Sequence, residues 1–421
     1  MNKEKLRGLG RRALILLLLA AAVLLLREAG SSAGIRRQLR SGESEAAEPV
    51  SGTESAGALR PAGAVQPVAA VVNLEGGGHF GAAYAAEPVS EIFQRFSADL
   101  GEALGSAGAP EPMSEEEFCA ALCRCGVYLK LPCSQPLELL AAWLGAEYHG
   151  EECAELLCLS AGENAVSLCC RTGEGEFFHC ATAAAAERLR SRTEEFADNG
   201  VSFAFSDPLL RDGDPCTPVC AGGRSAAEVK LSPTQLTASE TDALLRSLGM
   251  NSFISGSYYE ADGTEVFIDE ESTLRLSPSG GLSFRRPGFP ENMEALSRVE
   301  TVSLARRIAE SVLGACGDGA LIFAGVSYGE TQRSYTVCFD YAVNGIPVRL
   351  GSGHAAELVL RGEKLMQARM QLCRFALTGE TVPLLPDRQA LALAAAEHTG
   401  AALCYRAGGE TMNCDWERTD G

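Results

Sequence analysis

Basic residues are scarce in this sequence, whereas acidic residues are common. The chain has 421 residues, of which 36 are Lys or Arg and 55 are Asp or Glu, giving a formal charge of −19 at pH 7. Nucleic-acid binding relies on clustered Lys and Arg that displace counterions from phosphates, so no nucleic-acid partner is predicted. A mean hydropathy near zero argues against a membrane protein with many spans. With 46% apolar residues, the chain can still bury large cores.

Histidine is also rare, and no metal-binding pattern is present. The five His residues are scattered, and neither an H-E-x-x-H nor a C-x-x-C spacing occurs. Zinc sites need spacings of this kind, so no metal and no cofactor is predicted. The acidic run at 269–271 lacks the alternating oxygens and the tight glycine turn of a Ca²⁺ loop. We expect a solvated turn there.

Two short sequence matches suggest catalysis but lack the structural context that each reaction needs. Residues 76–81 match G-x-G-x-x-G, yet the next helical pattern begins only at Pro88, so a turn is expected rather than a dinucleotide loop. Residues 325–329 match G-x-S-x-G, and Asp340 and His354 follow in serine-hydrolase order. A nucleophile elbow is a strand followed by a helix, whereas another strand is predicted after this serine. A hydrolase is therefore disfavoured.

One long apolar run lies near the N-terminus. Residues 13–26 carry no charge, and five basic residues precede them. Fourteen residues rise about 21 Å as a helix, which is short for a bilayer span. Two interpretations stay open: a cleaved signal peptide or an uncleaved signal anchor over 13–27. We prefer the anchor because Arg27 and Glu28 interrupt the approach to a small-residue patch at 29–34. In both cases the chain that follows is exported.

Cysteine is abundant, with 16 residues, of which eleven lie between Cys119 and Cys220. An even count in an exported chain ordinarily suggests disulfides. However, Cys158, Cys169 and Cys180 fall inside apolar strand patterns, which is typical of small core residues. We expect mostly reduced core thiols, with some disulfides as the alternative.

The patterns of helices and strands indicate an α+β protein with antiparallel meanders. Glycine-bearing turns such as Asp262-Gly263 and Asn344-Gly345 are strong hairpin signals, and Ser114 with Glu117 forms a capping box. A second-half helix is expected to be capped by Ser239. The predicted organisation is a cytoplasmic basic tail at 1–12, a transmembrane anchor at 13–27, a flexible stalk at 28–66, a Cys-rich α+β domain at 67–228, and a helix-plus-meander domain with a loose internal duplication at 229–421.

Three further side-chain features have structural interpretations. Arg285 and Arg286 are interpreted as a charged pair that protects an edge strand. Trp143 lies among leucines and is expected in the core. Trp416 is expected either in the core or at a contact surface.

A Gly-, Pro- and Asp-rich segment at 206–228 is expected to be a loop.

The second half resembles the YycH/YycI family, which comprises membrane-anchored accessory proteins of the cell-wall sensor histidine kinase WalK/YycG in Firmicutes. The resemblance covers residues 230–421 together with the single N-terminal apolar run. The sequence motifs that carry it are Leu248-Gly249-Met250-Asn251, Tyr258 to Val266, Leu274-Arg275-Leu276, Gly280 to Phe284, Tyr335 to Tyr341, Asn344 to Val348, and the tail Asp415 to Gly421. The first exported domain and its many cysteines depart from the family.

The resemblance implies a non-enzymatic protein of the cell membrane, with a cytoplasmic N-terminus, a single span and an extracytoplasmic body. Its implied partners are a sensor histidine kinase and a related regulatory subunit. Small residues permit close contact between membrane helices, so Ala13, Ala20, Ala21 and Ala22 are the candidate partner contacts.

Two other hypotheses remain open at this stage. The first is an anchored or secreted module that binds an envelope ligand and has no kinase partner. The second is an exported enzyme, either a hydrolase or a thiol-dependent one. The absence of a converging catalytic constellation makes this second alternative the weakest of the three.

Overall fold

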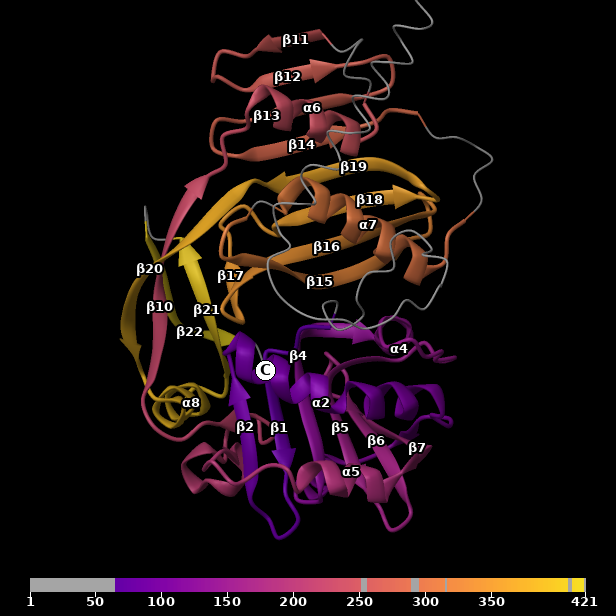
Figure 1. The fold of residues 1–421 in the computed structure, drawn as a ribbon, viewed down its shortest axis with the longest axis vertical. Coiled ribbons are helices and arrows are strands. Elements are labelled where there is room, and N and C mark those ends of the chain that lie inside the picture. The colour runs from indigo at the N-terminus through magenta and orange to yellow at the C-terminus, as the bar shows by residue number, and fades with distance from the viewer. Residues whose placement is uncertain (1–64, 251–255, 289–294, 315, 408–410, 420–421) are drawn as a thin grey trace, which may run out of the picture. The chain divides into compact units, whose positions relative to one another are not determined.

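The structure is a computed structural model that describes residues 65–250, 256–288, 295–314, 316–407 and 411–419. Within these residues the fold is α+β, as predicted, with seven α-helices and sheets that are almost entirely antiparallel (Figure 1). One sheet has seven strands, a second has thirteen, and a third has two. The predicted anchor and most of the predicted stalk lie outside the described residues.

The seven-stranded sheet is built from the first half of the chain and has helices on both faces. Its strands are β1 (Ala69–Asn73), β2 (His79–Ala83), β3 (Glu111–Pro112), β4 (Gly126–Pro136), β5 (Cys153–Ala161), β6 (Ala165–Arg171) and β7 (Phe177–Ala185), in the order β2-β1-β4-β5-β6-β7-β3. The helices are α2 (Ala86–Gly105), α3 (Glu115–Leu122), α4 (Leu137–Trp143) and α5 (Ala186–Thr193). The α3 side forms a smaller core of its own.

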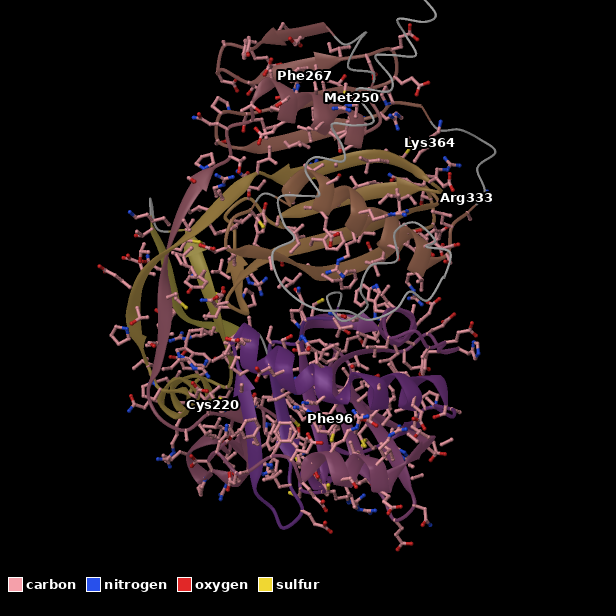
Figure 2. The ribbon with its side chains drawn as sticks, in the orientation of Figure 1. Phe96, Cys220, Met250, Phe267, Arg333 and Lys364 are labelled. Atoms are coloured by element: carbon pink, nitrogen blue, oxygen red, sulfur yellow. The ribbon has the colours of Figure 1, made fainter. Side chains whose placement is uncertain are left out.

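The local signals for these helices are confirmed. The buried residues of α2 recur at spacings of three and four, as in Val89, Ile92, Phe93 and Phe96. Phe96 is labelled in Figure 2. Ser114 and Glu117 form the capping box of α3 in both directions.

The thirteen-stranded sheet takes its strands from the rest of the chain. They are β10 (Arg224–Pro233), β11 (Gly256–Tyr259), β12 (Glu265–Ile268), β13 (Thr273–Leu276), β14 (Gly281–Arg285), β15 (Gly319–Gly329), β16 (Ser334–Val343), β17 (Ile346–Arg349), β18 (Ala356–Arg361), β19 (Lys364–Gln371), β20 (Cys373–Leu384), β21 (Gly400–Ala407) and β22 (Thr411–Thr419). Its helices are α6 (Ala238–Ser247), α7 (Arg298–Leu313) and α8 (Asp387–Ala395). In the sequence between these two sets of strands, β8 (Ser202–Phe203) pairs with β9 (Pro218–Val219) as a two-stranded sheet.

Each of α6 and α7 is followed by an antiparallel meander, and the two meanders join at their last strands. Leu274 of β13 faces Phe284 of β14, and Leu358 of β18 faces Ala368 of β19, ten residues apart in each case. Where β14 meets β19, Phe284 faces Ala368. An approximate two-fold axis therefore passes near this pair. All four side chains are fully buried, so the two meanders share one core layer, and α7 packs over β16 and β18 (Figure 1).

The segment 206–228, predicted as a loop, contains more structure than expected. It holds a short 3-10 turn, β9 and the start of β10, and β10 runs through the predicted domain boundary at 228/229. β10 pairs with β20 along most of its length. Both strands were missed because only Ala226 and Val229 are buried in β10, and much of β20 is exposed, so neither shows a regular apolar alternation.

The interpretation of Arg285 and Arg286 as protection for an edge strand is wrong. Their strand, β14, lies between β13 and β19 inside the sheet. Arg286 instead connects three segments: it donates hydrogen bonds to the Ser272 hydroxyl (3.1 Å) and to the Gly249 (3.1 Å) and Leu365 (3.3 Å) carbonyls.

The helix cap predicted at Ser239 is actually formed by Thr237. The Thr237 hydroxyl accepts from the Glu240 N–H, and the Glu240 carboxylate accepts from the Thr237 N–H at 2.8 Å. Thr237→Ala should therefore lower the free energy of unfolding by about 1 kcal/mol. The matched control, Ser239→Ala, should change it little. Urea denaturation followed by circular dichroism measures both, and an equal loss in the two variants would refute the assignment of the cap.

Candidate functional site

The glycine motif at 76–81 forms a hairpin, as predicted. It connects β1 to β2, which are antiparallel, and Gly76 and Gly77 have φ values of +100° and +93°. The next helix, α2, begins only at Ala86, beyond β2. A dinucleotide site needs a helix N-terminus directly against the pyrophosphate, and this loop does not provide one.

The three residues in hydrolase order do not assemble into a triad. His354 Nδ1 lies 2.9 Å from Asp340 Oδ1, so the acid and the base do meet. Ser327 lies in β15 opposite Thr336, which is four residues along β16 from Asp340. Four residues of strand extend about 13 Å, far beyond the hydrogen-bond distance that a nucleophile and its base require. Arg349 Nη1 lies 3.7 Å from Asp340 Oδ2. Asp340, His354 and Arg349 therefore form a polar cluster on the sheet surface.

The acidic run at 269–271 is a turn, as predicted. The Asp269 carboxylate accepts hydrogen bonds from the backbone N–H groups of Glu271 and Ser272, at 3.0 and 2.6 Å. Across the part of the chain that the structure describes, no three His, Cys, Asp or Glu side chains are grouped closely enough to hold a metal ion.

The cysteines lie mainly in the two cores of the first half and in the larger sheet. All 16 are unpaired in the structure, and nine are buried, including the three predicted core residues Cys158, Cys169 and Cys180. Burial raises the pKa of Cys158 well above that of an exposed thiol, so it stays protonated and unreactive. Cys119 differs because its hydrogen bond with Cys216 lowers its pKa. The redox state of the thiols in the cell stays a prediction.

A buried ion pair joins the first sheet to the end of the chain. The Arg224 guanidinium donates to both carboxylate oxygens of Asp387, at 2.5 and 2.7 Å, and to the Ala83 carbonyl at 2.9 Å. Its ζ carbon lies 5.7 Å from the ring centroids of both Tyr84 and Trp416. Arginine is suited to this position because it can pair bidentately and stack on rings at the same time. Trp416, predicted either in the core or at a contact surface, is half-buried and packs against the core.

A second connection is made around Trp143, which is buried as predicted. The Trp143 ring packs edge-on against Phe323 of β15, with ring centroids 5.7 Å apart. The ζ carbon of Arg306 in α7 lies 5.5 Å from the centroid of the Trp143 ring. Nearby, Arg298 Nη2 lies 2.9 Å from Glu138 Oε2, which connects α7 to α4. These contacts come from both large sheets, so the sheets share one apolar interface.

The third connection depends on a glycine. Asn344 and Gly345 form the predicted turn, with φ values of +51° and +81°, and the Asn344 carbonyl accepts from the Ala86 N–H at 2.9 Å. A Cβ added to Gly345 would lie 2.7 Å from that nitrogen. Only glycine therefore permits both the backbone conformation and the close approach of α2.

A cavity of about 790 Å³ lies beside this turn. Its apolar wall includes Val89 and Phe93 of α2 with Ile322 of β15, and its polar groups include Gln94 and Asp318. Cavities of this size, apolar with a few polar groups and placed between two structural layers, are typical of ligand sites. Together with the three connections, it defines the junction of the two sheets, the candidate functional site. Several residues of this junction were predicted as core or turn residues, but their meeting at one site was missed, because no local pattern marks contacts between segments so distant in sequence.

The predicted partner contacts, Ala13, Ala20, Ala21 and Ala22, lie outside the described residues, as does the predicted anchor. In the described parts of the chain, none of the helices combines the length and the apolar character that crossing a bilayer requires.

Comparison with known proteins identifies the fold. No family model matches the chain, and no curated protein matches it. The structure is similar to the crystal structure of YycH from Bacillus subtilis, with a TM-score of 0.53 and 9% sequence identity, over 86% of this chain and 95% of that one. The YycH-like fold predicted from the sequence is thereby confirmed. The match is also wider than predicted, because 86% of the chain exceeds residues 230–421 and includes part of the first half.

Proposed function

We propose that this protein is a non-enzymatic, membrane-anchored regulator of a two-component sensor histidine kinase that controls cell-wall homeostasis. The observation that carries the proposal is the YycH-like fold over 86% of the chain, together with the family resemblance of the second-half motifs. The separation of Ser327 from the Asp340–His354 pair also supports a role other than hydrolysis.

In this proposal, residues 13–27 anchor the chain, with the N-terminus in the cytoplasm and the body outside. A helix that packs against the transmembrane helices of a kinase, and binds one signalling state better than the other, shifts the equilibrium between the two states. Ala20, Ala21 and Ala22 supply the small surface that such packing needs.

Leucine substitution at Ala20, Ala21 and Ala22 is expected to abolish co-purification of the kinase, because the added bulk separates the packed helices. Affinity purification of the tagged full chain from detergent-solubilised membranes, followed by mass spectrometry, measures this. Val23→Leu, which adds bulk in the same apolar run, is the matched control and should retain the kinase.

Equal kinase recovery from the triple variant and from Val23→Leu would refute the assignment of the contact residues. Failure of the wild-type chain to recover any histidine kinase would refute the proposal itself. That outcome would favour an envelope ligand-binding module without a kinase partner.

A further inference from the structure

In the described part of the chain, the strands β13, β14 and β19 have exposed side chains on the face opposite α7, which we call the open face. On β13, β14 and β19 the buried residues Leu274, Phe284 and Ala368 alternate with exposed ones. Because neighbouring residues of a strand point to opposite faces, the exposed residues share the open face. A row of three crosses it: Arg275 faces Ser283, and Ser283 faces Arg369.

A second row lies two residues along. Gly281 of β14 faces Gln371 of β19, and Ser277 lies on its other side, where its hydroxyl accepts from the Gly281 N–H at 2.9 Å. Because glycine has no side chain, the Ser277 hydroxyl can occupy the space beside Gly281. A Cβ added there would lie 2.9 Å from the Ser277 hydroxyl. The two rows enclose a depression flanked by arginine, serine and glutamine.

This depression is a groove of about 330 Å³ whose lining contains no Asp or Glu. Its lining includes Arg275 and Arg369, the serines Ser277 and Ser283, and His354. Nearly all of these side chains offer hydrogen-bond donors. The absence of carboxylates is notable in a chain with 55 acidic residues.

The acidic residues nearest the groove leave most of its donors available. Glu260 accepts one hydrogen bond from Arg275 at 3.0 Å, and Glu357 lies 3.8 Å from Arg369, beyond hydrogen-bond range. Asp340 pairs with His354. A guanidinium has five N–H donors, so both arginines retain donors for a ligand.

We propose that this groove binds a phosphate group, carried either by a small soluble ester or by an anionic polymer. Cross-strand neighbours are about 5 Å apart, so the two arginines flank Ser283 closely enough to converge on one tetrahedral oxyanion. Arginine and hydroxyl donors are the groups that bind phosphate oxygens most strongly. Gly281 leaves room for the Ser277 hydroxyl, and both residues line the groove. This inference is independent of any kinase partner.

Isothermal titration of the purified full chain in detergent tests the proposal, with inorganic phosphate and glycerol 3-phosphate as small probes and polyphosphate as the polymeric one. Arg369→Gln and Arg275→Gln should each weaken binding by about tenfold or more, because each removes a charged hydrogen bond. Gly281→Ala, whose added Cβ would displace the Ser277 hydroxyl, should also weaken binding. The matched control is Arg285→Gln, on the same face of β14 but outside the groove, and it should bind as the wild type does.

Binding of the small probes with this pattern of variants supports the site and identifies a small ester as sufficient. Binding of polyphosphate alone with the same pattern also supports the site and identifies a polymer as the source. Two results overturn the proposal: no heat with any probe at millimolar concentration, or an equal loss in Arg285→Gln, which would indicate diffuse charge attraction rather than a built site. Circular dichroism of each variant confirms that the fold is retained.

Discussion

Asp387→Ala is expected to lower the free energy of unfolding by about 3–5 kcal/mol, the typical cost of leaving a buried charge without its partner. The Asp387 side chain is 3% exposed and that of Arg224 is 13% exposed, so little water can replace the lost carboxylate. The variant also removes the acceptor for the Cys220 N–H, 3.1 Å away. Urea denaturation followed by circular dichroism measures the loss.

Two controls separate this effect from a general weakening of α8. The double variant Arg224→Met, Asp387→Leu removes both charges and should recover most of the lost stability. Arg388 is in the same helix as Asp387 and forms an ion pair with Asp207 at the surface. Arg388→Ala removes this pair and should leave the unfolding midpoint nearly unchanged. If Asp387→Ala is no more damaging than Arg388→Ala, the ion pair does not stabilise the junction as described.

Phe284→Ala should also lower the free energy of unfolding by about 3–5 kcal/mol, because it leaves a cavity in a packed core. Phe284 is fully buried and lies where the two meanders join, opposite Ala368. Its loss therefore weakens both meanders at once. The same denaturation experiment measures it, with a single shifted transition expected.

Tyr259→Ala is the matched control for this variant. It also removes a large aromatic side chain from the same sheet, but Tyr259 is 69% exposed on the strand β11 at the sheet's edge, so we expect little change in stability. Comparable losses from Tyr259→Ala and Phe284→Ala would contradict the location of the core. Phe267, which is labelled in Figure 2 and is buried in the same core cluster as Leu274 and Phe284, provides an independent test of this core.

Features that depend on neighbouring residues were predictable from the sequence. The turns at Asp262-Gly263 and Asn344-Gly345 need positive φ at glycine, which no other residue adopts as easily, and both connect paired strands. The capping box at Ser114 depends on a contact three residues away. The helix at 88–104 was visible because its apolar residues recur at helical spacing.

Features set by long-range pairing were not predictable. Arg224 and Asp387 are far apart in sequence, and nothing local indicates that they meet. The groove depends on strand register: Arg275, Ser283 and Arg369 align only because of how β13, β14 and β19 pair, and a shift by one residue would move them to the other face. The cap at Thr237 was misplaced because Ser239 is an equally good capping residue by type.

The central claim is that this chain regulates a sensor histidine kinase, and kinase activity in a reconstituted membrane tests it most directly. The kinase recovered with the full chain is placed in lipid vesicles with the wild-type chain, with the Ala20, Ala21 and Ala22 leucine variant, or alone, and its autophosphorylation rate is measured. We predict that the wild-type chain changes the rate and that the variant gives the rate of the kinase alone. An identical rate in all three preparations would contradict the claim.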